Sequence, residues 1–238
     1  MKNLLLLFVF LICCQASNFA QTAKDYFDSG NAKYSLGDSK GAIRDFTKAI
    51  KLYPNYAEAY SKRGMVKMWI RDSKGALLDI NIAIKLNPNY AEAYYLRGGE
   101  KYHSLGDSRG AILDYNKALE LDSNFARAYN NRGYAKSKLG DQRGAILDIT
   151  KAIELDPNQA GCYYKRGECR RLLRDFRGAI LDYTKSMEID PSYAKDSYIN
   201  IGDIKHEIGD IEGACLDWSK AGELGESQAY ERIKENCQ

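Results

Sequence analysis

The sequence predicts an all-α protein in which antiparallel helix pairs stack on one another as a solenoid. The first observation is a Gly-Ala pair that recurs six times along the 238 residues, at steps of 34 or 35. The second is an aspartate three residues before each pair and another four residues after its glycine. The third is a proline that closes four of the units. A period of this length is the signature of repeat architectures, whose units cannot bury their apolar faces alone.

The six units share these landmarks in register. The Gly-Ala pairs are Gly41-Ala42, Gly75-Ala76, Gly110-Ala111, Gly144-Ala145, Gly178-Ala179 and Gly213-Ala214. The aspartates before them are Asp38, Asp72, Asp107, Asp141, Asp175 and Asp210. The aspartates after them are Asp45, Asp79, Asp114, Asp148, Asp182 and Asp217. Because the Gly-containing turn occurs in every unit, we interpret it as scaffold and not as a phosphate or calcium loop.

The unit from residue 57 to 90 shows how two helices fit one repeat. Tyr60 and Gly64 fall on one face of a first helix. Asp72 suits the N-cap of a second helix, because its carboxylate can accept the unpaired amide hydrogens there. Ile80 lies in an apolar stripe of that second helix, and Pro88 ends it because proline has no amide hydrogen to donate.

These positions resemble the tetratricopeptide repeat. The motif slots of that family hold Tyr60, Gly64, Lys67, Ala76, Ile80, Ala83 and Pro88 in one unit. In another unit they hold Tyr163, Gly167, Arg170, Ala179, Tyr183, Ser186 and Pro191. The resemblance extends from Ala23 to about Gly225. It implies a right-handed superhelix of helix pairs whose first helices line a concave face. The predicted repeats are residues 23–56, 57–90, 91–125, 126–159, 160–193 and 194–225, followed by a capping helix over residues 226–238. The last segment also resembles the related Sel1-type repeat.

Two departures from the repeat need explanation. An arginine precedes the first-helix glycine in four units, as Arg63, Arg97, Arg132 and Arg166. We interpret these arginines as partners of the second-helix aspartates, with an arginine-lined anion groove as the alternative. The third unit has one extra residue between Tyr94 and Gly106, near Gly98-Gly99 and His103. Inside a helix it would shift the register unless a π-bulge absorbed it; otherwise it is a tolerated insertion.

The first twenty residues are typical of a secretory signal peptide. Lys2 is followed by the apolar run from Leu4 to Cys14, and Ala20 is a small residue at which cleavage is expected. The run is shorter than the ~20 residues that a membrane-spanning helix needs. We therefore expect residues 1–20 to be removed and the mature chain to be periplasmic or secreted, without an integral membrane span. Lipid anchoring through Cys13 or Cys14 is the minor alternative.

Export permits disulfide bonds. Cys162 and Cys169 are seven residues apart, which on one helix is ~10.5 Å of rise and too far for a disulfide. Cys215 and Cys237 are the plausible pair, with two free buried thiols as the alternative.

No catalytic motif is present. His103 and His206 lie about three repeats apart, and the sequence contains no metal-binding or phosphate-binding motif. We expect no enzyme activity, no cofactor and no metal. The formal net charge of +3 comes from 35 basic and 32 acidic side chains, and no basic block stands out along the sequence. Composition therefore gives no support to nucleic-acid binding.

The resemblance implies instead a protein or peptide ligand on the first helices. The groove positions it marks, with aromatic and weakly polar side chains, are Phe27, Asn31, Tyr34, Met65, Trp69, Tyr95, His103, Asn130, Tyr134 and Tyr164. Ser61, Met68, Ser137, Glu168 and Arg171 occupy further such positions. Many of the aromatic residues could equally pack between adjacent repeats. The basic and amide residues with which family members clamp the C-terminal carboxylate of chaperones are absent, so chaperone-tail binding is not expected.

The predicted function is an exported, non-enzymatic interaction scaffold that binds a peptide or helix of a partner protein along the concave groove. A structural module that self-assembles in the cell envelope is the first alternative. A carbohydrate- or peptidoglycan-binding module is the second.

Overall fold

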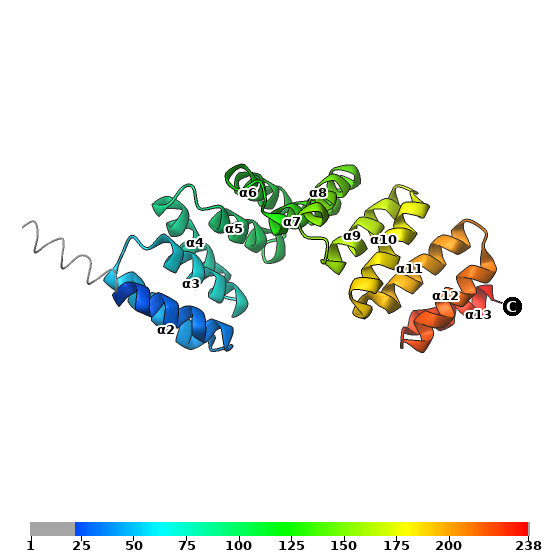
Figure 1. The fold of residues 1–238 in the computed structure, drawn as a ribbon, viewed down its shortest axis with the longest axis horizontal. Coiled ribbons are helices and arrows are strands. Elements are labelled where there is room, and N and C mark those ends of the chain that lie inside the picture. Colours follow the sequence, from blue (N-terminus) through cyan, green and yellow to red (C-terminus); the bar gives the residue numbers. More distant parts are fainter. Residues whose placement is uncertain (1–21, 238) are drawn as a thin grey trace, which may run out of the picture. The chain divides into compact units, whose positions relative to one another are not determined.

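A computed structural model describes residues 22–237, and within them every regular element is helical (Figure 1). The predicted signal peptide at residues 1–20 lies outside this range. Helical residues 22–35 are followed by α2 (Ser39–Leu52), α3 (Ala57–Trp69), α4 (Ser73–Leu86), α5 (Ala91–His103) and α6 (Ser108–Leu121). Then come α7 (Ala126–Lys138), α8 (Gln142–Leu155), α9 (Ala160–Leu172), α10 (Phe176–Ile189), the short 3₁₀ helix Pro191–Tyr193, α11 (Ala194–Glu207), α12 (Ile211–Glu223) and α13 (Ser227–Asn236).

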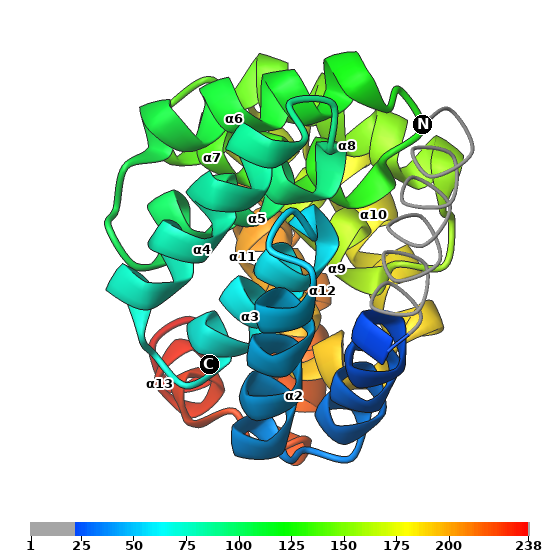
Figure 2. The ribbon, with the colours of Figure 1, turned by 90° about the vertical axis from the view of Figure 1, so that its left-hand side faces the viewer.

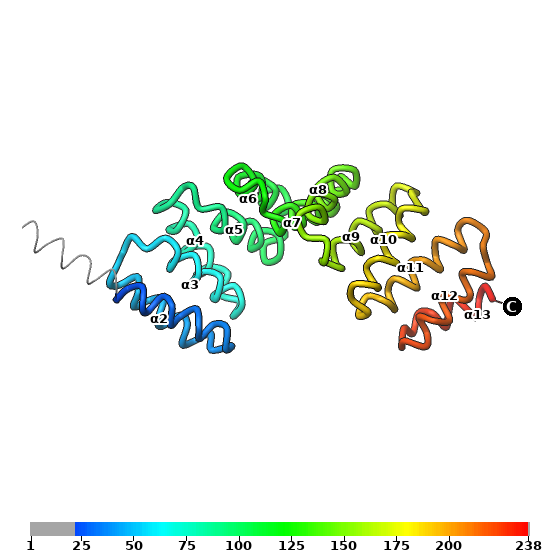
Figure 3. The backbone as a smooth tube through the Cα atoms, viewed as in Figure 1, coloured from blue at the N-terminus to red at the C-terminus, as the bar shows by residue number. Residues whose placement is uncertain are grey.

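The helices form consecutive antiparallel pairs, so the predicted all-α class of stacked helix pairs is confirmed. The backbone reverses at each short turn, as the tube in Figure 3 shows. The helices group into two compact units, unit 1 up to Asp122 and unit 2 from Ser123. In unit 1, α3 packs on α4 and also contacts α5; in unit 2, α7 packs on α8 and also contacts α9. Figure 2 shows how the helices of unit 1 layer against one another.

The six aspartates before the Gly-Ala pairs cap the second helices. Asp141, for example, accepts a 2.8 Å hydrogen bond from the Gly144 amide through Oδ1. A Cβ atom added to Gly144 would lie 2.1 Å from Asp141 Oδ2. Glycine is therefore required by the cap itself, because any side chain would displace the carboxylate that holds the helix start. The turn is scaffold, as its repetition predicts.

Small residues set the distance between the two helices of a pair. A Cβ on Gly64 would lie 2.8 Å from Ile80 Cγ1 and 3.1 Å from the carbonyl oxygen of Ala76. In unit 2, a Cβ on Gly133 would lie 2.7 Å from Ile149 Cγ1 and 3.2 Å from the carbonyl oxygen of Ala145. Ile80 and Ile149 are fully buried by this close approach, and they fill the core between the helix pairs.

The extra residue of the third repeat lies in a loop. Four residues join α5 to α6, whereas three join α3 to α4, and both first helices have 13 residues. In the third repeat the Asp107 amide donates to the Lys101 carbonyl, six residues back. In the second repeat the equivalent amide, of Asp72, donates to the Lys67 carbonyl, five residues back. The helix register is thus kept without a π-bulge, and Gly98 packs on Tyr115 as Gly64 packs on Ile80.

The four arginines bind their own repeat's buried aspartate. Arg166 Nε and Nη2 donate to the two oxygens of Asp182 at 2.9 and 2.7 Å. Arg166 Nη1 also donates to Thr150 of the preceding repeat at 3.1 Å. Arg63 makes the equivalent pair of contacts, to Asp79 and Thr47. Arg63, Arg97 and Arg166 therefore each hold two helices of one repeat together and link them to the repeat before, Arg97 through Asn81. Because their guanidinium groups are occupied in this way, these arginines do not form an open anion groove.

Candidate functional site

Unit 1 has a pocket at the C-terminal ends of its first helices. Tyr34, Ser35, Gly37, Ser39 and Trp69 line about 380 Å³ of open space. Trp69 is the last residue of α3 and its side chain is 72% exposed. Two of the predicted groove residues, Tyr34 and Trp69, are thus brought together beside solvent.

Three other predicted groove residues pack mainly into the core. The Phe27 ring lies 5.6 Å from that of Phe46 and 5.0 Å from that of Tyr56. Met65 and Tyr95 pack against the buried cluster around Ile80. For these side chains the contacts match the competing interpretation, that aromatic and Met residues pack between repeats.

The remaining predicted residues are scattered along the first helices. Asn31 is half-buried, and His103 is exposed with its ring edge-on to Tyr102 at 4.8 Å. Asn130 Oδ1 is buried and has no hydrogen-bond partner within residues 22–237. The Tyr134 hydroxyl donates to the Gly161 carbonyl at 3.2 Å, which fixes the ring between two repeats of unit 2.

A polar pocket lies in unit 2, between α9, α11 and α13. It encloses about 300 Å³. Its walls are formed by Tyr164, Arg171, Asp196, Ile199, Asn200, Asp203, Glu226, Gln228 and Arg232. Asn200 Nδ2 donates to the Tyr164 hydroxyl at 3.0 Å and to the Asp196 carbonyl at 2.9 Å. Desolvation by burial raises the pKa of Tyr164 to about 12, so its phenol remains a neutral hydrogen-bonding group at physiological pH.

Most of the charges in this pocket are already paired. Arg232 Nε and Nη2 donate to Asp203 at 2.6 and 3.0 Å, and this contact raises the pKa of Arg232. Glu226 lies 3.6 Å from Lys195. Arg171 differs, because in the described part of the chain it forms no ion pair with a carboxylate. Its Nε is buried and unpartnered within that same range. The pocket therefore presents the unpaired guanidinium of Arg171 and the carboxylate of Asp196, likewise without an ion pair among the described residues, beside a phenol and an amide.

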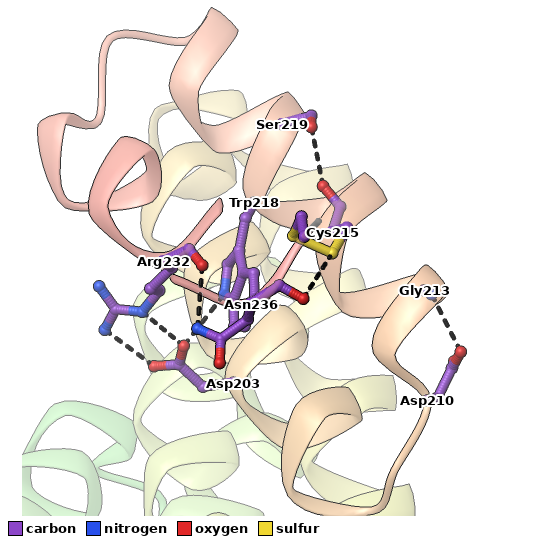
Figure 4. The surroundings of a disulfide bond; sticks show 9 residues. Asp203, Asp210, Gly213, Cys215, Trp218, Ser219, Arg232 and Asn236 are labelled. Atoms are coloured by element: carbon purple, nitrogen blue, oxygen red, sulfur yellow. Dashed lines mark hydrogen bonds and ion pairs between the residues drawn. A yellow bond between two sulfur atoms is a disulfide. The ribbon is translucent and has the colours of Figure 1, made fainter. Parts of the chain in front are cut away.

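The wall contributed by α13 is held by a disulfide and a hydrogen-bond network (Figure 4). Cys215 and Cys237 are bonded, with their Cα atoms 5.8 Å apart. Trp218 Nε1 donates to Asp203 Oδ1 at 3.0 Å, so Asp203 joins the buried Trp218 to Arg232 on α13 (Figure 4). Cys162 and Cys169 are free and buried. The disulfide thus fixes the helix that carries one side of the pocket.

Sequence analysis found Tyr164 but missed most of its neighbours. Asp203 and Arg232 come from different elements, 29 residues apart in sequence. Arg171 lies at a position that the family resemblance marks, but a single basic residue among many gives no signal. What distinguishes Arg171 is that its Nε is buried without a hydrogen-bond partner among residues 22–237, and that depends on tertiary structure.

Two kinds of feature are absent from the described residues. No cluster of three or more His, Cys, Asp or Glu side chains within them has the arrangement to hold a metal ion. None of the helices in residues 22–237 combines the length and apolarity needed to cross a membrane.

Comparison with protein families identifies the repeats. A family model described as TPR repeat matches residues 30–68 and 99–140, and a second, the tetratricopeptide repeat, matches residues 126–159. This chain contains tetratricopeptide repeats. The matched segments fall in both units, while the helix pairs outside them carry the same Asp caps and Gly-Ala pairs. The Sel1-like character of the last tetratricopeptide-like segment stays a prediction.

Several solved structures are similar to this chain, and one of them is described as a TPR protein. A crystal structure of MamA is 29% identical and covers 74% of this chain and 95% of its own, with a TM-score of 0.59. YrrB, described as a TPR protein with an unusual peptide-binding site, is 22% identical over 80% of this chain and 97% of its own, with a TM-score of 0.70. PilF of Pseudomonas aeruginosa is 17% identical and covers 92% of this chain and 99% of its own, with a TM-score of 0.80. The curated proteins contain no match.

Proposed function

We propose that this protein is a non-enzymatic interaction scaffold, exported to the cell envelope, which binds an extended peptide or a helix of a partner protein on its first helices. The observation that carries the proposal is the unit 2 pocket around Tyr164, Arg171 and Asn200. It opens on side chains of the first helices α9 and α11, the helices on which the tetratricopeptide family binds its ligands. Similarity to YrrB, whose description names a peptide-binding site, supports the same kind of ligand.

The unpaired Arg171 guanidinium favours a carboxylate of the partner as one contact in this pocket, and Asp196, which also forms no ion pair within the described residues, favours a basic group near it. Arg171 has no carboxylate partner among residues 22–237, whereas Asp203 and Glu226 face Arg232 and Lys195. A partner carboxylate can form paired hydrogen bonds with a guanidinium, a geometry that neutral groups cannot match. The Tyr164 hydroxyl and Asn200 amide can then bind the partner's backbone. Trp69 in unit 1 offers a separate apolar anchor, since exposed tryptophan is enriched at interfaces.

Site-specific photo-crosslinking tests this proposal. The chain from Gln21 onward, with a photo-reactive residue in place of Tyr164 or Trp69, is used to capture partners from an envelope extract. We expect one polypeptide crosslinked from both positions, with an acidic residue next to the attachment point opposite Tyr164. Arg171→Gln in the same chain should reduce the Tyr164 crosslink about tenfold or more, following the 1.5–3 kcal/mol of a charge-assisted hydrogen bond.

Arg177→Gln is the matched control, because Arg177 is an exposed arginine on the second helix α10. It should leave the crosslink unchanged. Equal capture by the Arg171 and Arg177 variants, with both folded by circular dichroism, would contradict the proposed pocket. Export itself is tested by fractionation: retention of the uncleaved chain in the cytoplasm would contradict it.

A further inference from the structure

The second helices of unit 1 gather more cations, and fewer exposed carboxylates, than the second helices of unit 2. On α2, Lys40, Arg44, Lys48 and Lys51 are spaced by four, four and three residues, which places them on one side of the helix. All four are exposed, while Phe46 on the opposite side is buried. The α4 and α6 helices add four further cations, Lys74, Lys85, Arg109 and Lys117. We call these eight residues, with Leu78 and Leu113 among them, the basic outer face.

Within the helices themselves the charges of the basic outer face are almost uncompensated, although the exposed cap aspartates Asp38, Asp72 and Asp107 lie just before them. The aspartates of α2, α4 and α6 are buried and engaged by cations of the first helices, which leaves Glu120 as the one acidic side chain exposed on these helices. Lys117 pairs with Glu120 at 2.7 Å, and Lys48 Nζ lies 4.9 Å from the Tyr26 ring centroid. Lys40, Arg44, Lys51, Lys74, Lys85 and Arg109 form no ion pair within residues 22–237.

Unit 2 provides an internal comparison. Its second helices α8, α10 and α12 carry five cations, Arg143, Lys151, Arg177, Lys185 and Lys220. They also carry four exposed carboxylates, Glu154, Glu188, Glu212 and Glu223. The same side of the same kind of helix is thus nearly neutral in unit 2 and strongly positive in unit 1. The repeat architecture therefore does not require the excess, and the formal charge of +3 for the whole chain conceals it.

Apolar side chains stand among these cations. Leu78 is 62% exposed and Leu113 is 69% exposed. Each is four residues after a cation, Lys74 or Arg109, on the same helix side. A single exposed leucine needs no explanation. Leucines set between unpaired cations, however, have the composition of surfaces that lie on anionic membranes, where the cations meet lipid phosphates and the apolar groups enter the interfacial layer.

We propose that the basic outer face of unit 1 binds the surface of an anionic phospholipid bilayer. The leucines favour lipid over nucleic acid, because a phosphate backbone offers no apolar layer for them. The charges favour lipid over a neutral protein partner. This inference does not depend on the unit 2 pocket, which lies on other helices, and it would leave that pocket free to bind a partner protein.

Vesicle sedimentation tests the inference with the chain from Gln21 onward, which carries all the described helices and lacks the apolar run Leu4–Cys14. We expect it to sediment with phosphatidylglycerol–phosphatidylcholine vesicles and not with phosphatidylcholine vesicles, and to be released by salt. A variant with Lys40→Gln, Arg44→Gln and Lys74→Gln should bind roughly a hundredfold more weakly, since each basic residue near an anionic surface contributes about fivefold.

The matched control removes the same charge from unit 2, as Arg143→Gln, Arg177→Gln and Lys185→Gln. It should change vesicle binding less than about fivefold. Leu78→Ser with Leu113→Ser should weaken binding, whereas Leu147→Ser with Leu181→Ser in unit 2 should not. Three outcomes would overturn the inference: no preference for phosphatidylglycerol, equal losses in the two triple variants, or binding to duplex DNA without binding to vesicles. Unchanged circular dichroism shows that each variant is folded.

Discussion

Asp79 accepts hydrogen bonds from Arg63 Nε and Nη2 at 2.8 and 2.7 Å, and its side chain is 1% exposed. Lys67 Nζ lies 2.8 Å from Oδ2 of the same carboxylate. Two cations of the first helix thus converge on one buried anion of the second. Removing that anion leaves both cations without their partner, which is far more costly than the loss of an exposed ion pair.

We therefore predict that Asp79→Asn lowers the free energy of unfolding by about 3 kcal/mol. Urea denaturation followed by circular dichroism measures the change. Asp28→Asn is the control, because Asp28 pairs with Lys24 on an exposed helix surface and should cost less than about 0.5 kcal/mol. If the two variants lost equal amounts of unfolding free energy, the buried ion pair would stabilise the fold no more than an exposed one.

The cap at Asp141 predicts a dependence between two substitutions. Gly144→Ala introduces a Cβ 2.1 Å from Asp141 Oδ2 and should cost about 1 kcal/mol through loss of the cap, although alanine favours helix. In an Asp141→Ala background the cap is already lost, so Gly144→Ala should become neutral or stabilising. Unfolding free energies of the two single variants and the double variant measure this coupling. Additive effects would show that the glycine is not needed for the cap.

Arg71 is an arginine in a backbone conformation that favours glycine. Its φ is 63°, and the equivalent turn positions Gly37, Gly140 and Gly209 also have positive φ. Relief of the left-handed strain outweighs the extra freedom of glycine in the unfolded chain. We expect Arg71→Gly to raise the unfolding free energy by about 0.5–1 kcal/mol, measured by urea denaturation. Arg71→Ala, which keeps a Cβ, is the control and should give no gain.

The disulfide between Cys215 and Cys237 should stabilise α13 and, through it, the unit 2 pocket. Closing a loop with a sequence separation of 22 is worth about 3 kcal/mol in the chain-entropy model. Cys215→Ser with Cys237→Ser should therefore increase amide hydrogen exchange over residues 227–236 and weaken partner capture at Tyr164. Unchanged exchange in those residues would contradict the role assigned to the bond.

The buried thiol of Cys162 allows a labelling experiment that tests whether the disulfide is closed in solution. Burial raises the pKa of its thiol to about 11, so the group stays protonated and unreactive in the native protein. A thiol reagent should thus label the unreduced native chain slowly. Rapid labelling of one or two thiols would indicate that the disulfide is open in solution or that the core around Cys162 is loose.

The sequence predicts the fold because each landmark acts locally. Asp141 caps its own helix, Gly64 faces Ile80 in its own repeat, and Arg166 reaches the aspartate 16 residues later. These contacts recur with the period, so six copies make the pattern plain. The extra residue of the third repeat was harder to place, because the sequence alone does not show that the helix ends at His103 before the insertion begins.

The candidate site is less predictable, since exposure depends on what the next repeat contributes. Tyr95 and Tyr164 are both tyrosines at groove positions. Tyr95 packs against the cluster around Ile80, whereas Tyr164 lines a pocket because Asn200 and Arg171 lie beside it. The basic outer face is not evident from the sequence for a related reason. Its cations on one helix are separated by three to eleven residues, so they form no run in the sequence, and the helical fold gathers them on one side.

The link from Arg63 to Thr47 is chemically the same as the link from Arg166 to Thr150, and both span 16 residues. Arg97 makes the corresponding link to Asn81, so these three arginines join neighbouring repeats by the same kind of contact. Because these contacts leave the outer sides of the second helices free, the surface charge can differ from module to module, as it does between the second helices of unit 1 and unit 2.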